Sequence, residues 1–119
     1  MQLKEQLIEY ASTLADFQMD RPFRKFPEYI ALRHKSSGKW FGLIMSVERS
    51  KLNLPGTGKV EIIDIKADPE VVSILKNSEG YQAAYHMNKA HWLTIVLDGK
   101  VDNAQIQQLL ADSYCLTKN

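Results

Sequence analysis

Two runs of strand-forming residues on either side of a Ser-Ser-Gly cluster constrain the fold of this chain more than any other feature. Residues 29–35 read YIALRHK and residues 39–47 read KWFGLIMSV, with the cluster at residues 36–38 between them. Aromatic and β-branched residues that flank a short polar turn are typical of an antiparallel hairpin. Regular alternation would place four side chains of the second run on one face, which we expect to be the core side: Phe41, Leu43, Met45 and Val47.

Helical and strand patterns surround this hairpin. Residues 3–14 carry apolar side chains at spacings of three and four, which predicts an amphipathic N-terminal helix. The further elements expected are a strand over 59–66, a helix from Asp68-Pro69 to Gly80, a strand over 91–97, and a last helix after Asp102 or Asn103. The sequence therefore predicts an α+β fold, with an antiparallel sheet packed by N-terminal, middle and C-terminal helices.

The composition is that of one globular domain, residues 1–119. Hydrophobic residues make up 45% and charged residues 24% of the chain, which allows a core without a disulfide or a metal. Cys115 is the single cysteine, so no intramolecular disulfide can form, and we expect its thiol to be buried by the last helix. The start of the chain lacks the apolar run of a secretory signal, and no stretch is long and apolar enough for a membrane span. A cytoplasmic location is expected.

Charge is unevenly distributed along the chain. The net charge is only +1, but residues 21–66 contain ten Lys or Arg residues against four Asp or Glu residues, a balance of +6. Such a segment fits either solvated strand ends and loops or a surface that binds an anionic partner. Within it, Phe23 and Phe26 lie in a proline-flanked connection and are expected to pack inward.

No catalytic or metal-binding constellation stands out. The three histidines, His34, His86 and His91, lack the helical spacing and the accompanying carboxylates of a metal site, so we expect no metal and no cofactor. Residues 54–59 read LPGTGK but lack the spacing and the Lys-Ser/Thr ending of a phosphate-binding loop. There is no nucleophile-elbow sequence either. We therefore expect a protein without enzymatic activity.

The segment at residues 86–92, HMNKAHW, is the most unusual in the chain. Two imidazoles, an amide, an ammonium and an indole within seven residues can bind phosphates and stack on bases. The alternative is structural: Asn88 and Lys89 would form a turn, His91 would begin a strand, and Trp92 would fill the core. Both interpretations remain open at the level of the sequence.

Several short motifs together resemble the bacterial MmcQ/YjbR family. They are the KWF run at 39–41 with Ile44, HMNK at 86–89, HW at 91–92 with Thr94, LDG at 97–99, and SY at 113–114. The resemblance spans nearly the whole chain. It implies a frataxin-like α+β fold and supplies no catalytic residues. A "double wing" DNA-binding role has been proposed for the family.

We interpret the chain as a DNA-binding module whose basic strand pair forms one wing. Its candidate contact residues are Arg33, His34, Lys35, Lys39 and Trp40, joined by Asn88, Lys89, His91 and Trp92 in one locus beside Lys39. One alternative is a small-molecule or anion pocket built from Lys39, Asn88, Lys89 and His91. The other is a protein-interaction adaptor that uses a free sheet edge or an apolar patch near Tyr85 or Trp92.

Overall fold

The fold is a single six-stranded antiparallel sheet with helices on one side. The computed structural model describes residues 2–118. The elements in chain order are α1 (Leu3–Ala11), β1 (Phe17–Asp20), β2 (Ile30–His34), β3 (Trp40–Glu48), the 3₁₀ helix η1 (Arg49–Leu52), β4 (Lys59–Lys66), α2 (Pro69–Leu75), β5 (Tyr81–Ala83), β6 (Trp92–Val96) and α3 (Asn103–Thr117). The strand order is β1-β2-β3-β4-β6-β5. The predicted α+β class and the antiparallel sheet are confirmed.

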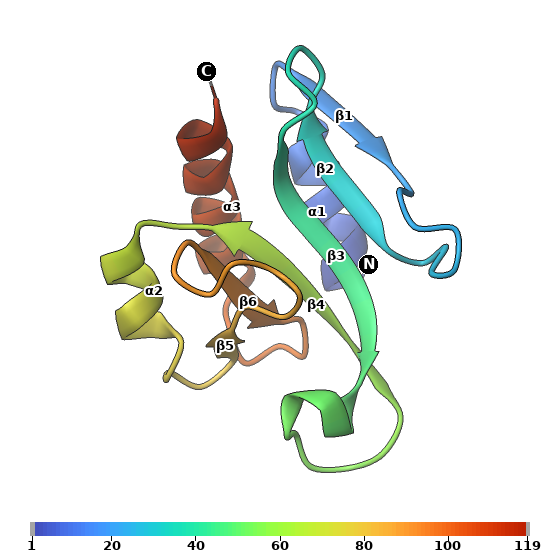
Figure 1. Cartoon of the computed structure of the whole chain (residues 1–119), viewed down its shortest axis with the longest axis vertical. Helices are drawn as coiled ribbons and strands as arrows, with labels where there is room; N and C mark the ends of the chain where they lie inside the picture. The colour runs from blue at the N-terminus through green and yellow to red at the C-terminus, as the bar shows by residue number, and fades with distance from the viewer. Residues whose placement is uncertain (1, 119) are drawn as a thin grey trace.

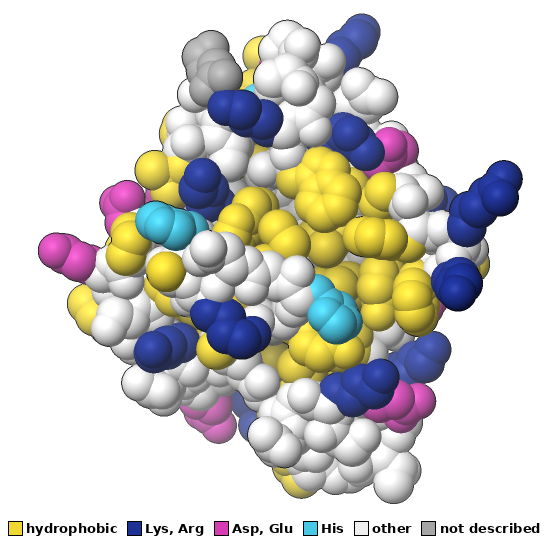
Figure 2. Space-filling model, in the orientation of Figure 1, with side chains coloured by type: hydrophobic (Ala, Val, Ile, Leu, Met, Phe, Trp, Pro, Cys, Tyr) yellow, Lys and Arg dark blue, Asp and Glu magenta, His cyan; other side chains and the backbone are white. Residues whose placement is uncertain are grey.

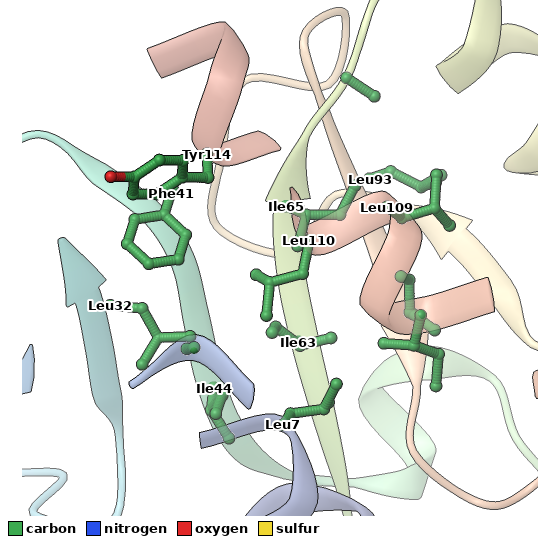
Figure 3. Close-up of a cluster of buried hydrophobic side chains, with 14 of the residues drawn as sticks. Leu7, Leu32, Phe41, Ile44, Ile63, Ile65, Leu93, Leu109, Leu110 and Tyr114 are labelled. Carbon is green, nitrogen blue, oxygen red and sulfur yellow. The ribbon is translucent and has the colours of Figure 1, made fainter. Parts of the chain in front are cut away.

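Helices α1 and α3 lie together against one face of the sheet, and α2 flanks β5 and β6 (Figure 1). Figure 3 shows Leu7 of α1 and Leu110 of α3 directed toward Ile63 of β4. These three side chains are fully buried in the main core cluster. Burial of such aliphatic side chains is the principal source of stability for this layer, at about 1.5–3 kcal/mol each.

Hydrogen bonds fix α3 on the middle of the sheet. Ser113 Oγ donates to the carbonyl of Phe41 at 2.6 Å and accepts the backbone N–H of Lys66 at 2.9 Å. The hydroxyl of Tyr114 accepts the N–H of Asp16 at 3.1 Å. Gly42 permits the close approach, because a Cβ there would lie 3.3 Å from Leu110 Cδ1. The helix therefore holds both β3 and β4 in a fixed position.

A β-bulge interrupts the alternation of β3. Leu32 pairs with Gly42, whereas the next residue, Arg33, pairs with Trp40, so Phe41 is an extra residue in the ladder. Phe41 consequently packs on the helix side with Ile44. The prediction that Phe41 shares a face with Leu43, Met45 and Val47 is wrong. The extra residue of the bulge breaks the alternation between Phe41 and Leu43, so these two side chains lie on opposite faces of the sheet.

The N-terminal helix ends at Ala11, earlier than the apolar pattern suggested. The Ser12 and Thr13 hydroxyls donate to the carbonyls of Glu9 and Tyr10, which draws these side chains back onto the helix end. The chain then turns and forms β1, a strand that the sequence pattern did not predict. Among residues 2–118, no helix is long and apolar enough to cross a membrane.

The sheet face opposite α1 and α3, here called the open face, is also largely apolar. It carries a second buried cluster that includes Leu43, Met45 and Ile62. The connection at residues 84–91, here called the β5–β6 loop, crosses this face in front of the sheet (Figure 1) and contributes Tyr85 and Met87 to the cluster. The β5–β6 loop therefore covers part of the open face.

Candidate functional site

A hollow of about 310 Å³ lies on the open face, between the segment that precedes β2 and the β5–β6 loop. We call it the aromatic hollow. Its lining consists of Phe23, Phe26, Tyr29, Trp40, Leu43, Met45, His86 and Met87. Figure 2 shows hydrophobic side chains gathered in the middle of this face, with a histidine among them and Lys and Arg side chains around them. Its volume is at the small end of the range for ligand pockets, which fits one small flat group.

Four aromatic rings linked by pairwise contacts form one wall. Phe23 meets Tyr29 and Trp40 edge to face, at centroid separations of 5.9 and 6.0 Å, while Phe26 stacks on Tyr29 at 4.8 Å. Arg21 closes this segment by donating to the carbonyl of Pro27. Phe23 and Phe26 are 38% and 46% exposed, so the expectation that they pack inward is wrong. Aromatic side chains left this exposed on a soluble domain often belong to a binding surface.

The opposite wall is the β5–β6 loop, which hydrogen bonds hold in shape. Lys89 Nζ donates to the carbonyl of Ala84, and Asn88 Oδ1 accepts the backbone N–H groups of Ala90 and His91. His86 adopts a left-handed conformation with φ of 64°, which non-glycine residues rarely do. The loop therefore presents His86 and its neighbour Met87 to the hollow in a preset position.

A buried carboxyl group lies beneath this loop. Asp64 of β4 pairs in register with Leu43, on the floor of the hollow, and with Thr94 of β6. Thr94 Oγ1 donates to Asp64 Oδ1 and accepts the N–H of Tyr85, which links the carboxyl group to the loop. Asp64 Oδ2 has no hydrogen-bond partner within residues 2–118. Burial raises the pKa of Asp64 to about 7, although the hydrogen bond from Thr94 and the charge of Lys89 act to lower it.

The basic strand pair differs from its predicted arrangement. His34 is only 2% exposed and shares a hydrogen bond with Thr117 of α3, so it cannot act as a surface contact. Its prediction as a contact residue is wrong, because β2 alternation turns it to the helix side with Leu32. Arg33 lies on the other side, paired with Asp20 at 2.8 Å and placed over the ring of Trp40 at 5.9 Å. Lys35 and Lys39 are exposed near the hairpin turn.

The HMNKAHW segment divides between two roles. Asn88 and Lys89 use their polar atoms within their own loop, as the structural interpretation expected. His91 is exposed, and its carbonyl accepts the N–H of Ala67. Trp92 is half-buried at the start of β6, opposite Lys66. The residues of this segment that line the hollow are His86 and Met87.

Sequence reasoning missed most of the hollow. The contacts of Phe23, Phe26 and Tyr29 could have been suspected from the aromatic residues at every third position of residues 23–29. Cys115 was also misjudged: it is exposed, beside a groove between α2 and α3. No group of three or more His, Cys, Asp or Glu side chains in the described part of the chain is arranged to hold a metal ion.

Together these features define an α+β domain whose sheet face opposite α1 and α3 carries an aromatic hollow. The YjbR family model matches residues 12–116. The chain is 38% identical over 118 residues to the uncharacterised protein YyaQ of Bacillus subtilis, covering 99% of this chain and all of that protein. The uncharacterised protein YjbR of Escherichia coli K12 is 36% identical over 53 residues, 44% of this chain and 45% of that one. The chain belongs to the YjbR family.

Solved structures agree with this membership. A crystal structure of a Pseudomonas syringae protein superposes with a TM-score of 0.91 at 39% identity, covering 97% of this chain and 98% of that one. The Deinococcus radiodurans protein DR2400, described as a DUF419 domain, gives a TM-score of 0.76 at 25% identity, covering 98% and 78% of the two chains. These likenesses establish the fold and the family.

Proposed function

We propose that the protein is a non-enzymatic module that binds single-stranded DNA across the open face. The observation that carries the proposal is the combination of exposed aromatic rings in a hollow with Lys and Arg side chains around it (Figure 2). Proteins that bind single strands combine a basic track for the phosphates with aromatic side chains on which bases stack. Bases within a duplex are stacked on one another and cannot reach such a hollow.

The charge distribution supports an anionic partner. Residues 21–66 supply ten basic side chains, and one of the four acidic residues in that segment, Asp64, is buried. Lys51 and Lys59 line a second depression that shares Phe26 and Tyr29 with the hollow. Lys59 and Arg33 already have acidic partners, Glu28 and Asp20. The phosphate contacts are assigned to Lys35, Lys39 and Lys51, because their side chains are exposed within the basic segment.

Fluorescence anisotropy with labelled oligonucleotides tests the proposal. Three phosphate contacts predict a slope of log affinity against log salt near −2 for a single strand, since each contact contributes about −0.7. Lys39→Ala should weaken binding to every sequence and reduce the slope by about 0.7. The matched control is Lys100→Ala. Lys100 lies in the turn before α3, is half-exposed and pairs with Glu79. It should leave both affinity and slope unchanged.

Two outcomes would overturn the proposal. One is no binding of single-stranded DNA below about 100 μM at low salt, the weak end of non-specific affinity. The other is a duplex that binds more tightly than the single strand of the same length, because the basic side chains alone, without the aromatic rings, would then account for binding.

A further inference from the structure

We infer that the aromatic hollow holds one unpaired nucleobase, with thymine preferred, while the lysines around it contact the flanking phosphates. This inference rests on the proposed function and adds to it a specific subsite. Sequence-independent stacking on a flat platform would predict no preference among bases. A hollow with walls and a floor predicts one.

The hollow is built before any ligand arrives. The loop that supplies His86 and Met87 is fixed by the Lys89–Ala84 hydrogen bond and by the link from Tyr85 through Thr94 to Asp64. On the other side, the contact of Phe23 with Trp40 holds the two rings in place. A preformed site does not have to order its side chains on binding, so the entropic cost of binding is low.

The size and lining select the ligand. A hollow of about 310 Å³ with aromatic walls fits a flat ring, and the basic side chains around it favour an occupant that carries negative charge nearby. A nucleotide within a strand meets both conditions, because its base is flat and uncharged and its phosphates lie outside the hollow. A carboxylate or phosphate inside the hollow would lie on the apolar floor formed by Leu43 and Met45 and would lose its hydration.

The apolar floor also distinguishes among the bases. Adenine, guanine and cytosine carry exocyclic amino groups with two N–H donors each, and a buried donor without an acceptor weakens binding by about 5- to 150-fold. Thymine has no exocyclic amino group, so its single donor is one ring N–H, fewer than in any of the other three bases, and it carries a methyl group. Burial of that methyl group against Leu43 or Met45 should favour thymine over uracil by about fourfold.

Oligonucleotides that contain a single base test this inference. Each probe is a short strand of abasic units with one central base. All probes therefore carry the same charge, and the single base is the only group in each that can occupy the hollow. Thymine should bind about 5- to 150-fold more tightly than the fully abasic strand, in line with the usual contribution of one stacked base. The affinity of the uracil strand should lie between those of the thymine strand and the abasic strand. The strands with an amino-bearing base should bind more weakly than the uracil strand. Trp40→Ala should reduce the thymine strand to the level of the abasic strand.

A second measurement does not depend on the stability of that variant. In a Trp92→Phe protein, Trp40 is the only tryptophan. Saturation with the thymine strand should quench its fluorescence, whereas saturation with the abasic strand should not. Equal affinity for all strands, or quenching by none of them, would overturn the base subsite while leaving strand binding intact. Failure of every strand, including an ordinary thymine oligomer, would instead overturn the proposed function.

Discussion

Replacing Asp64 with Asn should remove most of the dependence of stability on pH that this carboxyl group creates. Burial raises its pKa from 3.8 to about 7, so between these values the folded protein holds a proton that the unfolded chain has released. The contribution of Asp64 to stability is therefore largest below pH 4, falls as the pH rises toward 7, and is constant above it. The full loss is about 4 kcal/mol at 1.36 kcal/mol per pH unit. About 2 kcal/mol of it falls between about pH 5.5 and 8.5.

Urea unfolding at several pH values measures this effect. The unfolding free energy of the native protein should fall by about 2 kcal/mol across that range, relative to the Asp64→Asn variant. Asn keeps the size of the side chain and can still accept the Thr94 hydroxyl, as the protonated carboxyl group does. The two proteins differ only at residue 64, so the difference between their pH profiles belongs to that side chain. Parallel pH profiles for the two proteins would show that Asp64 is not protonated in the folded state and would refute the reasoning.

Two further predictions concern packing and exposure. Phe41→Ala should lower the unfolding free energy by about 3–5 kcal/mol, because the ring is fully buried between His34 and Tyr114. Phe41→Leu is the control and should lose less stability. A thermal or urea midpoint of Phe41→Ala close to that of the native protein would contradict this packing. Cys115 should react with iodoacetamide at the rate of an exposed thiol in the native protein, as followed by mass spectrometry, and a reaction that waits for unfolding would contradict its exposure.

The sequence predicted most elements correctly because their apolar periodicity matched the burial they acquire. β4 and β6 read as strands since they are rich in β-branched and apolar residues, and α2 was recognised by Asp68 and Pro69 at its start. β1 was missed because its four residues carry no clear alternation and follow a helical pattern. A short edge strand of this kind is defined by its partner more than by its own residues.

Two errors about individual side chains could have been avoided with the same rules. Buried positions of α3 include Ile106, Leu110, Ser113 and Thr117, a repeat of three and four residues that leaves Cys115 on the outer side. His34 follows Leu32 at the period of a strand and so faces the helices. Both errors came from judging a residue by its chemistry before its place in the periodic pattern.

The aromatic hollow could not be predicted in this way. It requires the proline-flanked segment before β2, a β-bulge, and a loop more than forty residues later in the chain to meet on one face. Periodicity describes single elements, whereas the position of an irregular segment depends on its tertiary contacts. The family motifs at residues 88–94 contribute mainly by fixing that loop, which is why their polar chemistry suggested a contact role that Asn88 and Lys89 do not show in this structure.

The bulge at Phe41 also has a consequence for how this surface can change during evolution. The extra residue lets Trp40 face the hollow while Phe41 packs in the core on the helix side. Deletion of the Phe41 codon would restore regular alternation in β3, leave Trp40 opposite Arg33 on the open face, and remove an aromatic ring from the core. The number of residues in this strand thus affects the packing of α3 more than the lining of the hollow. Relatives that lack one residue at this point should keep the aromatic open face and differ in how the last helix packs on the sheet.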